Sequence, residues 1–174
     1  SSEAVLSAEE RELGVAMVDL GGGTTDLAIF LDGSIRHTAV LPIGGQNLTK
    51  DLAIGLLTSQ TDAEKIKVQH GIARTELVHG HQMVEVPSVG DRPPRQFTRR
   101  DIAEILEPRV EEMFDLVKRE IVRAGYEGML GAGVVITGGT SLLEGMPDAA
   151  ERGLNLPARR GLPTGIGGLR DIVS

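Results

Sequence analysis

The apolar residues in the first part of the chain form three short runs separated by polar and turn residues. The runs cover residues 14–20, 27–31 and 34–41, and their lengths are typical of β-strands. Asp32 and Gly33 separate the second run from the third and suit a two-residue hairpin turn. The pattern therefore predicts three consecutive antiparallel strands.

After the third strand, the short apolar runs give way to apolar residues spaced as in a helix. A first helix, capped by Asn47 or Thr49, is predicted to end near Leu57. A second helix is predicted to begin at Thr61, whose hydroxyl can form a capping box with Glu64. The positions expected to be buried in the first helix are Leu48, Leu52, Ile54 and Leu56.

The rest of the chain contains one long amphipathic pattern and several short elements. Because a proline inside a helix costs about 3 kcal/mol, we expect Pro108 to kink or break the long helix near Glu107. The predicted elements are, in order, short β-like pieces at residues 76–78 and 83–86, a long helix opened by Thr98, a buried strand at 134–137, a helix from about 142 to 153 and a last strand at 158–162.

Composition and charge exclude several classes of function. The 174 residues contain no cysteine, so disulfides and cysteine metal sites are excluded. The net charge of −7 argues against a general nucleic-acid binder. No stretch approaches the roughly 20 apolar residues of a membrane span, and the amino end lacks the layout of a signal peptide. We therefore expect a cytoplasmic protein.

The turn after the first strand is the first candidate binding site. The strand ends in the carboxylate of Asp19, and Gly21, Gly22 and Gly23 follow, then Thr24. Glycine backbones can approach an anion closely, and a carboxylate beside a phosphate suits a hydrated Mg²⁺ ion. The pattern favours a phosphate-binding turn, and the alternative is an ordinary glycine-rich hairpin with Asp19 as a turn cap.

Two later stretches have related chemistry. The strand at residues 134–137 ends in Gly138 and Gly139, which indicates either a ligand-binding turn before a helix or an ordinary tight connection. Glu64 and Lys67 lie three apart on the second helix and could bind ribose and base, or could form a solvated ion pair.

Residues 92–100, which we call the arginine segment, contain four arginines and no acidic residue. Arginine pairs with carboxylates through two parallel hydrogen bonds, so this segment could dock an acidic peptide. The alternative is an ordinary solvated surface.

Several longer stretches resemble known families. The actin-like ATPases share motifs similar to DLGGGTTD, AEKIK and VVITGGTSLLEGMP, in this order. The stretches ERELGVAMVDLGGGTTDLAIF, VEVPSVGDRPPR and ILEPRVEEM are similar to one branch of them, the FtsA family of bacterial cell-division proteins. The resemblance extends from about Glu9 to Asp171.

The resemblance implies an α/β fold, namely the second lobe of an actin-like ATPase. This lobe is a ribonuclease-H-like mixed sheet with flanking helices and a small inserted α+β subdomain. Residues 1–45 and 108–174 would form the nucleotide-binding part, and residues 46–107 would form the inserted subdomain.

The resemblance also implies a site for ATP and Mg²⁺. Asp19 would hold Mg²⁺ through water, and Glu64 and Lys67 would face the ribose and adenine. The phosphates would bind to Gly21, Gly22, Gly23 and Thr24, and the adenosine would be bordered by Gly138, Gly139, Thr140 and Met146.

Members of the family tether the tubulin-like protein FtsZ to the inner membrane and form actin-like filaments. The resemblance therefore implies a location on the cytoplasmic face of the inner membrane at the division septum. It also implies docking of the partly acidic FtsZ carboxyl tail on the inserted subdomain, where Arg99 and Arg100 lie in the matching region. No nucleic-acid partner is implied.

Measured against the family, the chain is expected to begin at the second lobe and to end before the membrane anchor. Half of the nucleotide site would then be missing, so we expect weak ATP binding without hydrolysis and no enzyme activity. Two alternatives remain open at this point: a lobe of a chaperone-like or sugar-kinase-like ATPase, and a peptide-docking module that works without nucleotide.

Overall fold

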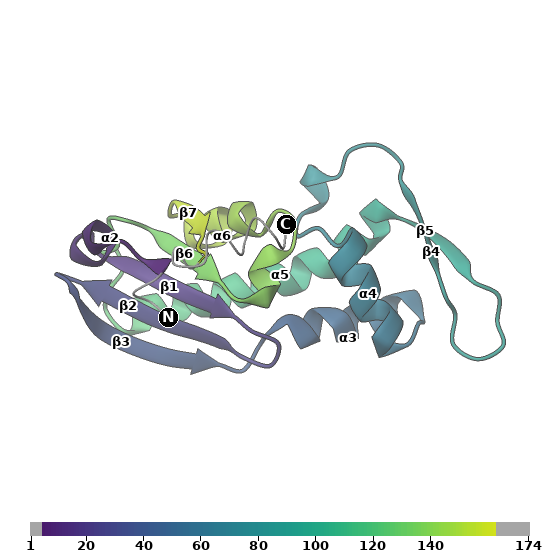
Figure 1. The fold of residues 1–174 in the computed structure, drawn as a ribbon, viewed down its shortest axis with the longest axis horizontal. Coiled ribbons are helices and arrows are strands. Elements are labelled where there is room, and N and C mark those ends of the chain that lie inside the picture. The colour runs from purple at the N-terminus through teal and green to yellow at the C-terminus, as the bar shows by residue number, and fades with distance from the viewer. Residues whose placement is uncertain (1–4, 163–174) are drawn as a thin grey trace.

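The computed structural model describes residues 5–162. The molecule is elongated, with a five-stranded sheet at one end and a two-stranded hairpin at the other (Figure 1). Among the described residues, no helix combines the length and apolar character of a membrane span. The helices and strands are α2 (Ala8–Leu13), β1 (Val15–Leu20), β2 (Thr25–Leu31), β3 (Ser34–Leu41), α3 (Gly45–Leu56), α4 (Gln60–His70), β4 (Met83–Val86), β5 (Arg95–Thr98), α5 (Arg99–Arg123), β6 (Val134–Thr137), α6 (Met146–Leu154) and β7 (Ala158–Arg160), with 3-10 helices η1 (Thr75–Leu77) and η2 (Gly139–Leu142).

The large sheet is mixed, with the strand order β3-β2-β1-β6-β7. The pairs β1–β2 and β2–β3 are antiparallel, which confirms the three predicted strands, whereas β1–β6 and β6–β7 are parallel. Because β1 and β6 run in the same direction, both strands end at one edge of the sheet. The two glycine turns, after Leu20 and after Thr137, therefore lie side by side. The predicted α/β class with a mixed sheet is confirmed.

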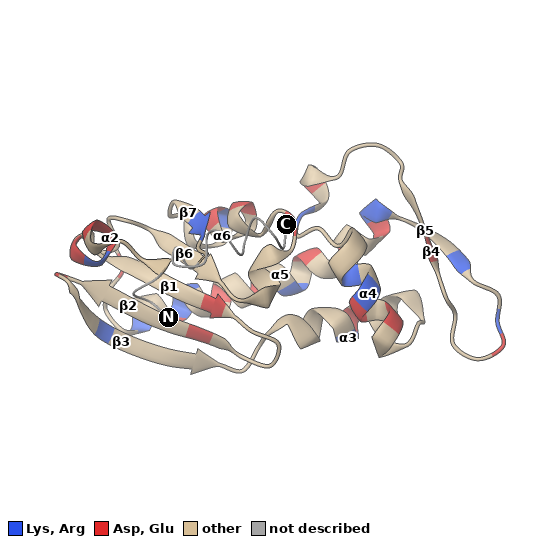
Figure 2. Ribbon diagram, in the orientation of Figure 1, with Lys and Arg blue, Asp and Glu red and all other residues tan. Residues whose placement is uncertain are grey.

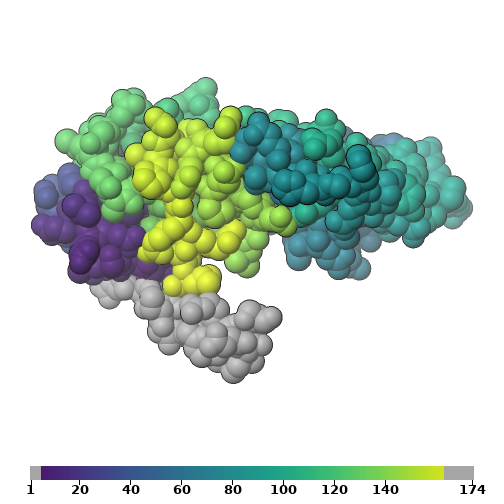
Figure 3. Space-filling view, turned by 90° about the horizontal axis from the view of Figure 1, so that it is seen from above, coloured from purple at the N-terminus to yellow at the C-terminus, as the bar shows by residue number. Residues whose placement is uncertain are grey.

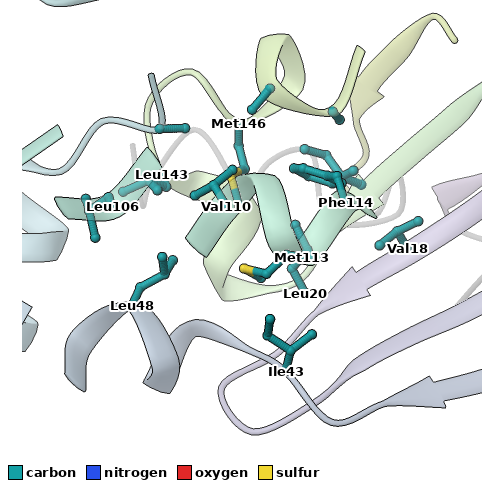
Figure 4. Packing of buried hydrophobic residues seen from close by; sticks show 14 of the residues in the cluster. Val18, Leu20, Ile43, Leu48, Leu106, Val110, Met113, Phe114, Leu143 and Met146 are labelled. Carbon is teal, nitrogen blue, oxygen red and sulfur yellow. The ribbon is translucent and has the colours of Figure 1, made fainter. Parts of the chain in front are cut away.

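Helix α5 covers one face of this sheet. Its Phe114 and Met113 are fully buried in one large apolar cluster with Val18 and Leu20 of β1 (Figure 4). The same cluster includes Leu48, Leu52 and Ile66 from α3 and α4. One continuous core therefore fixes α3 and α4 relative to the edge of the sheet.

The opposite face of the sheet packs against the start of the described chain. Val5 and Leu6 form a second cluster with Val15, Phe30 and Val135. Figure 3 shows the N-terminal residues in purple beside the C-terminal residues in yellow.

An ion pair joins α2 to β7 at this place. Arg159 donates two hydrogen bonds to the carboxylate of Glu10, at 2.8 and 2.7 Å. The bond from Arg159 lowers the pKa of Glu10 to about 2; partial burial opposes this shift and Ser7 adds to it. Hydrogen bonds from Arg123 and His37 likewise lower the pKa of Glu120 to about 2.

These lowered pKa values predict the acid sensitivity of the fold. Because both pKa values are below the 4.5 of an unperturbed glutamate, the pairs stabilise the protein above pH 4.5 and lose this effect as the pH falls toward 2. In urea titrations, Glu10→Gln should lower the free energy of unfolding by about 1–2 kcal/mol at pH 7. The free energy of unfolding of this variant should also fall less steeply as the pH is lowered below 4.5. The exposed neighbour Glu9→Gln is the control, and equal pH profiles for both variants would contradict this assignment.

Several predicted helix starts are wrong, because the residues that cap these helices differ from the predicted ones. Helix α3 begins at Gly45 with Gly44 as the N-cap residue, rather than at Asn47 or Thr49. Ser59 caps α4 by accepting a hydrogen bond from the amide of Asp62, so the predicted start at Thr61 is also wrong. Ile54, which was expected to be buried, is 68% exposed.

The predicted break at Pro108 is wrong, because α5 is one helix of 25 residues. Pro108 is exposed, as is Glu104. Helix geometry leaves the carbonyl of Glu104 without an amide partner at Pro108, and on this exposed face water can satisfy it.

Other differences concern short segments. Residues 76–78 were expected to be β-like, but η1 occupies most of this stretch. The hairpin partner of β4, strand β5, was not predicted. Helix α6 begins at Met146, after η2, and not near residue 142. The last strand was predicted over residues 158–162 and is confirmed as β7.

The proposed division of the chain at residues 46–107 stays a prediction. Its second boundary lies inside α5, which continues from the hairpin to the large sheet. The large apolar cluster likewise includes residues from both sides of the boundary.

Candidate functional site

Two glycine turns and the start of α3 meet at the edge of the large sheet. The amide of Gly21 donates to the carbonyl of Thr24 at 3.0 Å and closes the first turn. The hydroxyl of Thr140, in η2 after the second turn, donates to the carbonyl of Gly21 at 3.3 Å. The two turns that the sequence indicated are therefore in direct contact.

Helix α3 begins directly against the first turn. Its first amides, Gly45 and Gln46, donate to the carbonyls of Gly21 and Gly22, both at 2.8 Å. A methyl group at Gly44 would lie only 2.5 Å from the Gly22 carbonyl oxygen, so this contact requires glycine. The turn is therefore held rigidly by backbone hydrogen bonds.

Lys67 and Glu64 reach this place from α4. The Lys67 ammonium donates to the carbonyl of Gly45 at 3.1 Å and to the hydroxyl of Thr49 at 2.9 Å. It also lies 3.0 Å from a carboxylate oxygen of Glu64. The ion pair is therefore present, but the Lys67 side chain is only 12% exposed, whereas that of Glu64 is 51% exposed.

The charge state of Glu64 follows from its surroundings. Partial burial raises the pKa of Glu64, but the hydrogen bond from Thr49 at 2.6 Å and the Lys67 ammonium together outweigh burial. The net result is a pKa below the ordinary value, so Glu64 is ionised at neutral pH. It can accept hydrogen bonds from ligand hydroxyls.

These groups border a cleft of about 670 Å³, which we call the glycine cleft. A cavity of this size is typical of a binding site for a small molecule. The residues that line it are Gly22, Gln46, Leu48, Glu64, Lys67, Val68, Gln69, Gly71, Arg99, Gly139, Thr140, Leu142, Leu143 and Glu144.

Five of the eleven residues implied by the resemblance thus line one cleft: Gly22, Glu64, Lys67, Gly139 and Thr140. Gly21, Gly23, Thr24 and Gly138 belong to the adjoining turns. Met146 is different, because its side chain is fully buried in the core behind the cleft (Figure 4). The ligand roles of these residues stay predictions.

Asp19 lies at the end of β1, opposite Asp26 of β2 and beside Thr137 of β6. Its side chain is exposed, and Gly138 packs directly on it. Within residues 5–162, no group of three or more histidine or acidic side chains is arranged to bind a metal ion directly. The role of Asp19 in holding a hydrated Mg²⁺ ion stays a prediction.

Sequence reasoning missed the positions of Glu144 and Arg99 in the wall of the cleft and that of the buried Thr49 beside it. Thr49 connects Glu64 to Lys67, and Glu144 extends the wall formed by η2. Arg99, which was assigned to partner docking, lines the cleft instead of the outer surface.

A second cleft, of about 720 Å³, lies between α5 and α6 and is lined by many carboxylates. The second cleft has five acidic side chains against two arginines, whereas the glycine cleft has two acidic and two basic side chains beside backbone turns, so the second cleft repels phosphate more strongly. An anionic ligand therefore favours the glycine cleft. The acidic residues in the second cleft are Glu76, Glu107, Glu111, Glu112 and Asp115.

The arginine segment lies at the hairpin end of the molecule, where Figure 2 shows several basic positions in blue. Arg92, Arg95 and Arg100 are exposed, but the Arg99 side chain is only 18% exposed. Arg92 and Arg95 flank a small apolar notch of about 190 Å³ that includes Leu57 and Val89. The arginine segment is thus divided between the hairpin surface and the glycine cleft.

Known structures share this architecture. The chain is similar to MreB5 of Spiroplasma citri bound to ADP, with a TM-score of 0.69 at 20% sequence identity over 91% of this chain and 51% of that one. It is also similar to the MamK double helical filament, with a TM-score of 0.68 at 18% identity over 92% of this chain and 54% of that one. The fold is therefore that of the actin-like ATPases.

Sequence comparison is more specific. The family model described as cell division protein FtsA matches residues 16–173. Cell division protein FtsA of Pseudomonas aeruginosa is 49% identical over 173 residues, which cover 99% of this chain and 42% of that protein. The chain thus spans about two fifths of the length of this relative. These matches decide against a chaperone-like or sugar-kinase-like lobe, and the chain belongs to the FtsA family of cell division proteins.

Proposed function

We propose that the glycine cleft binds ATP with Mg²⁺ and forms half of the nucleotide site of a cell-division scaffold. The observation that supports this most directly is the convergence of two glycine turns with Lys67 and Glu64 on one cleft. Backbone amides, a lysine and an ionised carboxylate are the groups that phosphates and ribose hydroxyls require. MreB5, a structural neighbour, is described as bound to ADP.

In this proposal the residues divide by chemistry. The turn from Gly21 to Thr24 binds the β and γ phosphates, and Asp19 holds the hydrated Mg²⁺, which neutralises phosphate charge. Glu64 accepts hydrogen bonds from ribose hydroxyls, and Lys67 fixes Glu64 and contributes positive charge. Gly138, Gly139 and Thr140 border the adenosine from the other side of the cleft, with Met146 behind them.

For the whole protein, we propose a scaffold that links FtsZ to the inner membrane and assembles as actin-like filaments at the division septum. Its family and the likeness to the MamK double helical filament support this role. For the present chain alone, we propose weak ATP binding without hydrolysis. Stoichiometric turnover of ATP by the pure chain would contradict that part of the proposal.

Replacing Asp19 tests the proposed Mg²⁺ role. We expect ATP to bind the unaltered chain more tightly with Mg²⁺ than with a chelator, and Asp19→Asn to remove this difference. The loss should be about tenfold, the lower end of the effect of removing a group that orients a metal shell. Calorimetric titration with ATP, with and without Mg²⁺, measures it.

Asp32→Asn is the matched control, because Asp32 is also exposed but lies in the β2–β3 turn. This variant should keep the Mg²⁺ dependence of the unaltered chain. If Asp19→Asn kept it too, Asp19 would be a turn cap rather than a metal-holding group.

A second function, docking of the FtsZ carboxyl tail, is favoured by the hairpin surface. The tail is expected to be acidic in part, and the exposed arginines flank an apolar notch that could receive an apolar side chain. Arg95 also lies over the Phe97 ring, 5.0 Å from its centre, which restricts its motion. We propose that Arg92, Arg95 and Arg100 take part, whereas Arg99 is occupied in the glycine cleft.

Calorimetric titration with a peptide of the FtsZ tail tests this docking. Replacing Arg92, Arg95 and Arg100 together by alanine should weaken binding by about tenfold or more, as expected for a loss of about 1.4 kcal/mol or more. Arg36→Ala, an exposed arginine on β3, is the control. Equal affinity of both variants would place the docking site elsewhere. Binding that is the same with and without Mg-ATP would indicate that docking works without nucleotide.

A further inference from the structure

An ion pair closes one end of the glycine cleft, and it has no part in the phosphate binding proposed above. Arg99, the first residue of α5, donates to a carboxylate oxygen of Glu144 at 2.8 Å. Both residues line the cleft, Arg99 beside α4 and Glu144 beyond η2. The pair therefore connects the two walls between which a ligand would lie.

The Arg99 guanidinium also binds the end of α4. It donates to the carbonyl of His70 at 3.0 Å and to that of Gly71 at 3.3 Å. Carbonyls at a helix C-terminus lack intrahelical partners and favour a cation through the helix dipole. Arg99 thus fixes the last turn of the helix that presents Glu64 and Lys67.

The second wall is tied to the same segment by backbone contacts. Ala73 donates its amide to the carbonyl of Glu144 at 2.8 Å, and Ile72 and Glu144 form an isolated parallel bridge. These backbone contacts thus fix the position of the Glu144 main chain, and the ion pair with Arg99 fixes the direction of the Glu144 side chain. Removing either charge leaves the backbone bridge intact but releases the side chains at this end of the cleft.

The position of the pair indicates which part of a ligand it affects. On α4, His70 lies about one helical turn beyond Lys67, whose ammonium contacts the start of α3 beside the glycine turn. Val68 and Leu142, 73% and 63% exposed, provide apolar surface in the same cleft. This end is therefore suited to the base of a nucleotide and not to its phosphates.

We propose that Arg99 and Glu144 form a clasp that closes the base end of the glycine cleft, so that Arg99 acts as a positioning residue for nucleoside recognition. This inference rests on the proposed nucleotide function. It also assigns Arg99 a role different from that of its neighbour Arg100, which is exposed.

The clasp predicts a selective loss of affinity. Arg99→Gln and Glu144→Gln should each weaken binding of Mg-ATP by about five- to tenfold, less than for truncating a fully buried charged pair, because the Glu144 side chain is 62% exposed. Both should affect tripolyphosphate, which has no base or ribose, much less: through charge alone, its affinity should fall slightly in Arg99→Gln and rise slightly in Glu144→Gln. Arg99→Lys keeps the charge but not the forked geometry, so it should give an intermediate affinity for ATP. Arg100→Gln is the matched control and should bind both ligands like the unaltered chain.

Calorimetric or chemical-shift titrations of the chain with Mg-ATP and with tripolyphosphate measure both affinities, and thermal unfolding checks each variant. Glu144→Gln changes a side chain that is 62% exposed and should fold even if Arg99→Gln does not. An unchanged ratio of the two affinities in Glu144→Gln would overturn the clasp while the proposed function stands. Failure of the unaltered chain to bind either ligand would overturn both.

Discussion

Replacing Gly138 by alanine is expected to destabilise the fold by about 2–4 kcal/mol, because two independent costs add. Gly138 has φ of 89°, a conformation that residues with a Cβ atom rarely adopt. An added methyl group would also lie 2.6 Å from the carbonyl oxygen of Leu20, and closer still to the carboxylate of Asp19. Neither backbone can shift easily, since β1 and β6 are paired in the centre of the sheet.

The adjacent Gly139→Ala is the matched control for this experiment. An added methyl at Gly139 has no neighbour within 4 Å, and its backbone does not require glycine. Alanine there should leave the free energy of unfolding unchanged or raise it by up to about 1 kcal/mol by restricting the unfolded chain. Urea unfolding of the two variants measures the difference. Equal stabilities would show that the two turns are not packed against each other as described.

Lys67→Met is expected to weaken binding of Mg-ATP by about 10- to 100-fold, since an interaction with a charged group contributes about 1.5–3 kcal/mol. Methionine keeps the apolar stem but removes the ammonium that contacts Gly45, Thr49 and Glu64. Without this cation, the ionised Glu64 loses its partner and repels the phosphates. Calorimetric titration with Mg-ATP measures the loss.

Lys65→Met is the control, because Lys65 lies on the same helix with an exposed side chain. It changes the net charge by the same amount, so any long-range electrostatic effect should be equal in both variants. A similar loss of affinity in both would mean that only overall charge matters. Circular dichroism of both proteins should confirm that the helices are retained.

The antiparallel part of the sheet was predictable because its signals are local, unlike the parallel pairing of β1 with the distant β6. Alternating apolar runs and the Asp32-Gly33 turn are enough to define β1, β2 and β3. The caps of α3 were not predictable in this way, because amides of Gly45 and Gln46 bond to a turn more than twenty residues earlier. At Pro108 the amphipathic pattern was a better guide than the proline itself, because α5 continues with Pro108 on its exposed, polar face.

In the site, too, some features could be predicted from sequence motifs and others depend on contacts between distant residues. Family motifs indicated Gly22, Lys67 and Thr140, which the fold places in one cleft. The role of Arg99 could not be inferred, because arginines at positions 99 and 100 have equal chemistry in the sequence. Only the direction in which α5 begins determines which of the two reaches Glu144, 45 residues away.

The most direct test of the account is an amide chemical-shift titration of this 18.5 kDa chain with Mg-ATP. Nucleotide binding in the glycine cleft should give saturable shifts centred on Gly22, Gly23, Lys67, Gly139 and Thr140, at millimolar or lower concentration because weak binding is expected. Absence of shifts at these amides up to about 10 mM, well above a dissociation constant of about 1 mM, would contradict nucleotide binding by this cleft. Shifts centred instead on the acidic cleft would contradict it equally.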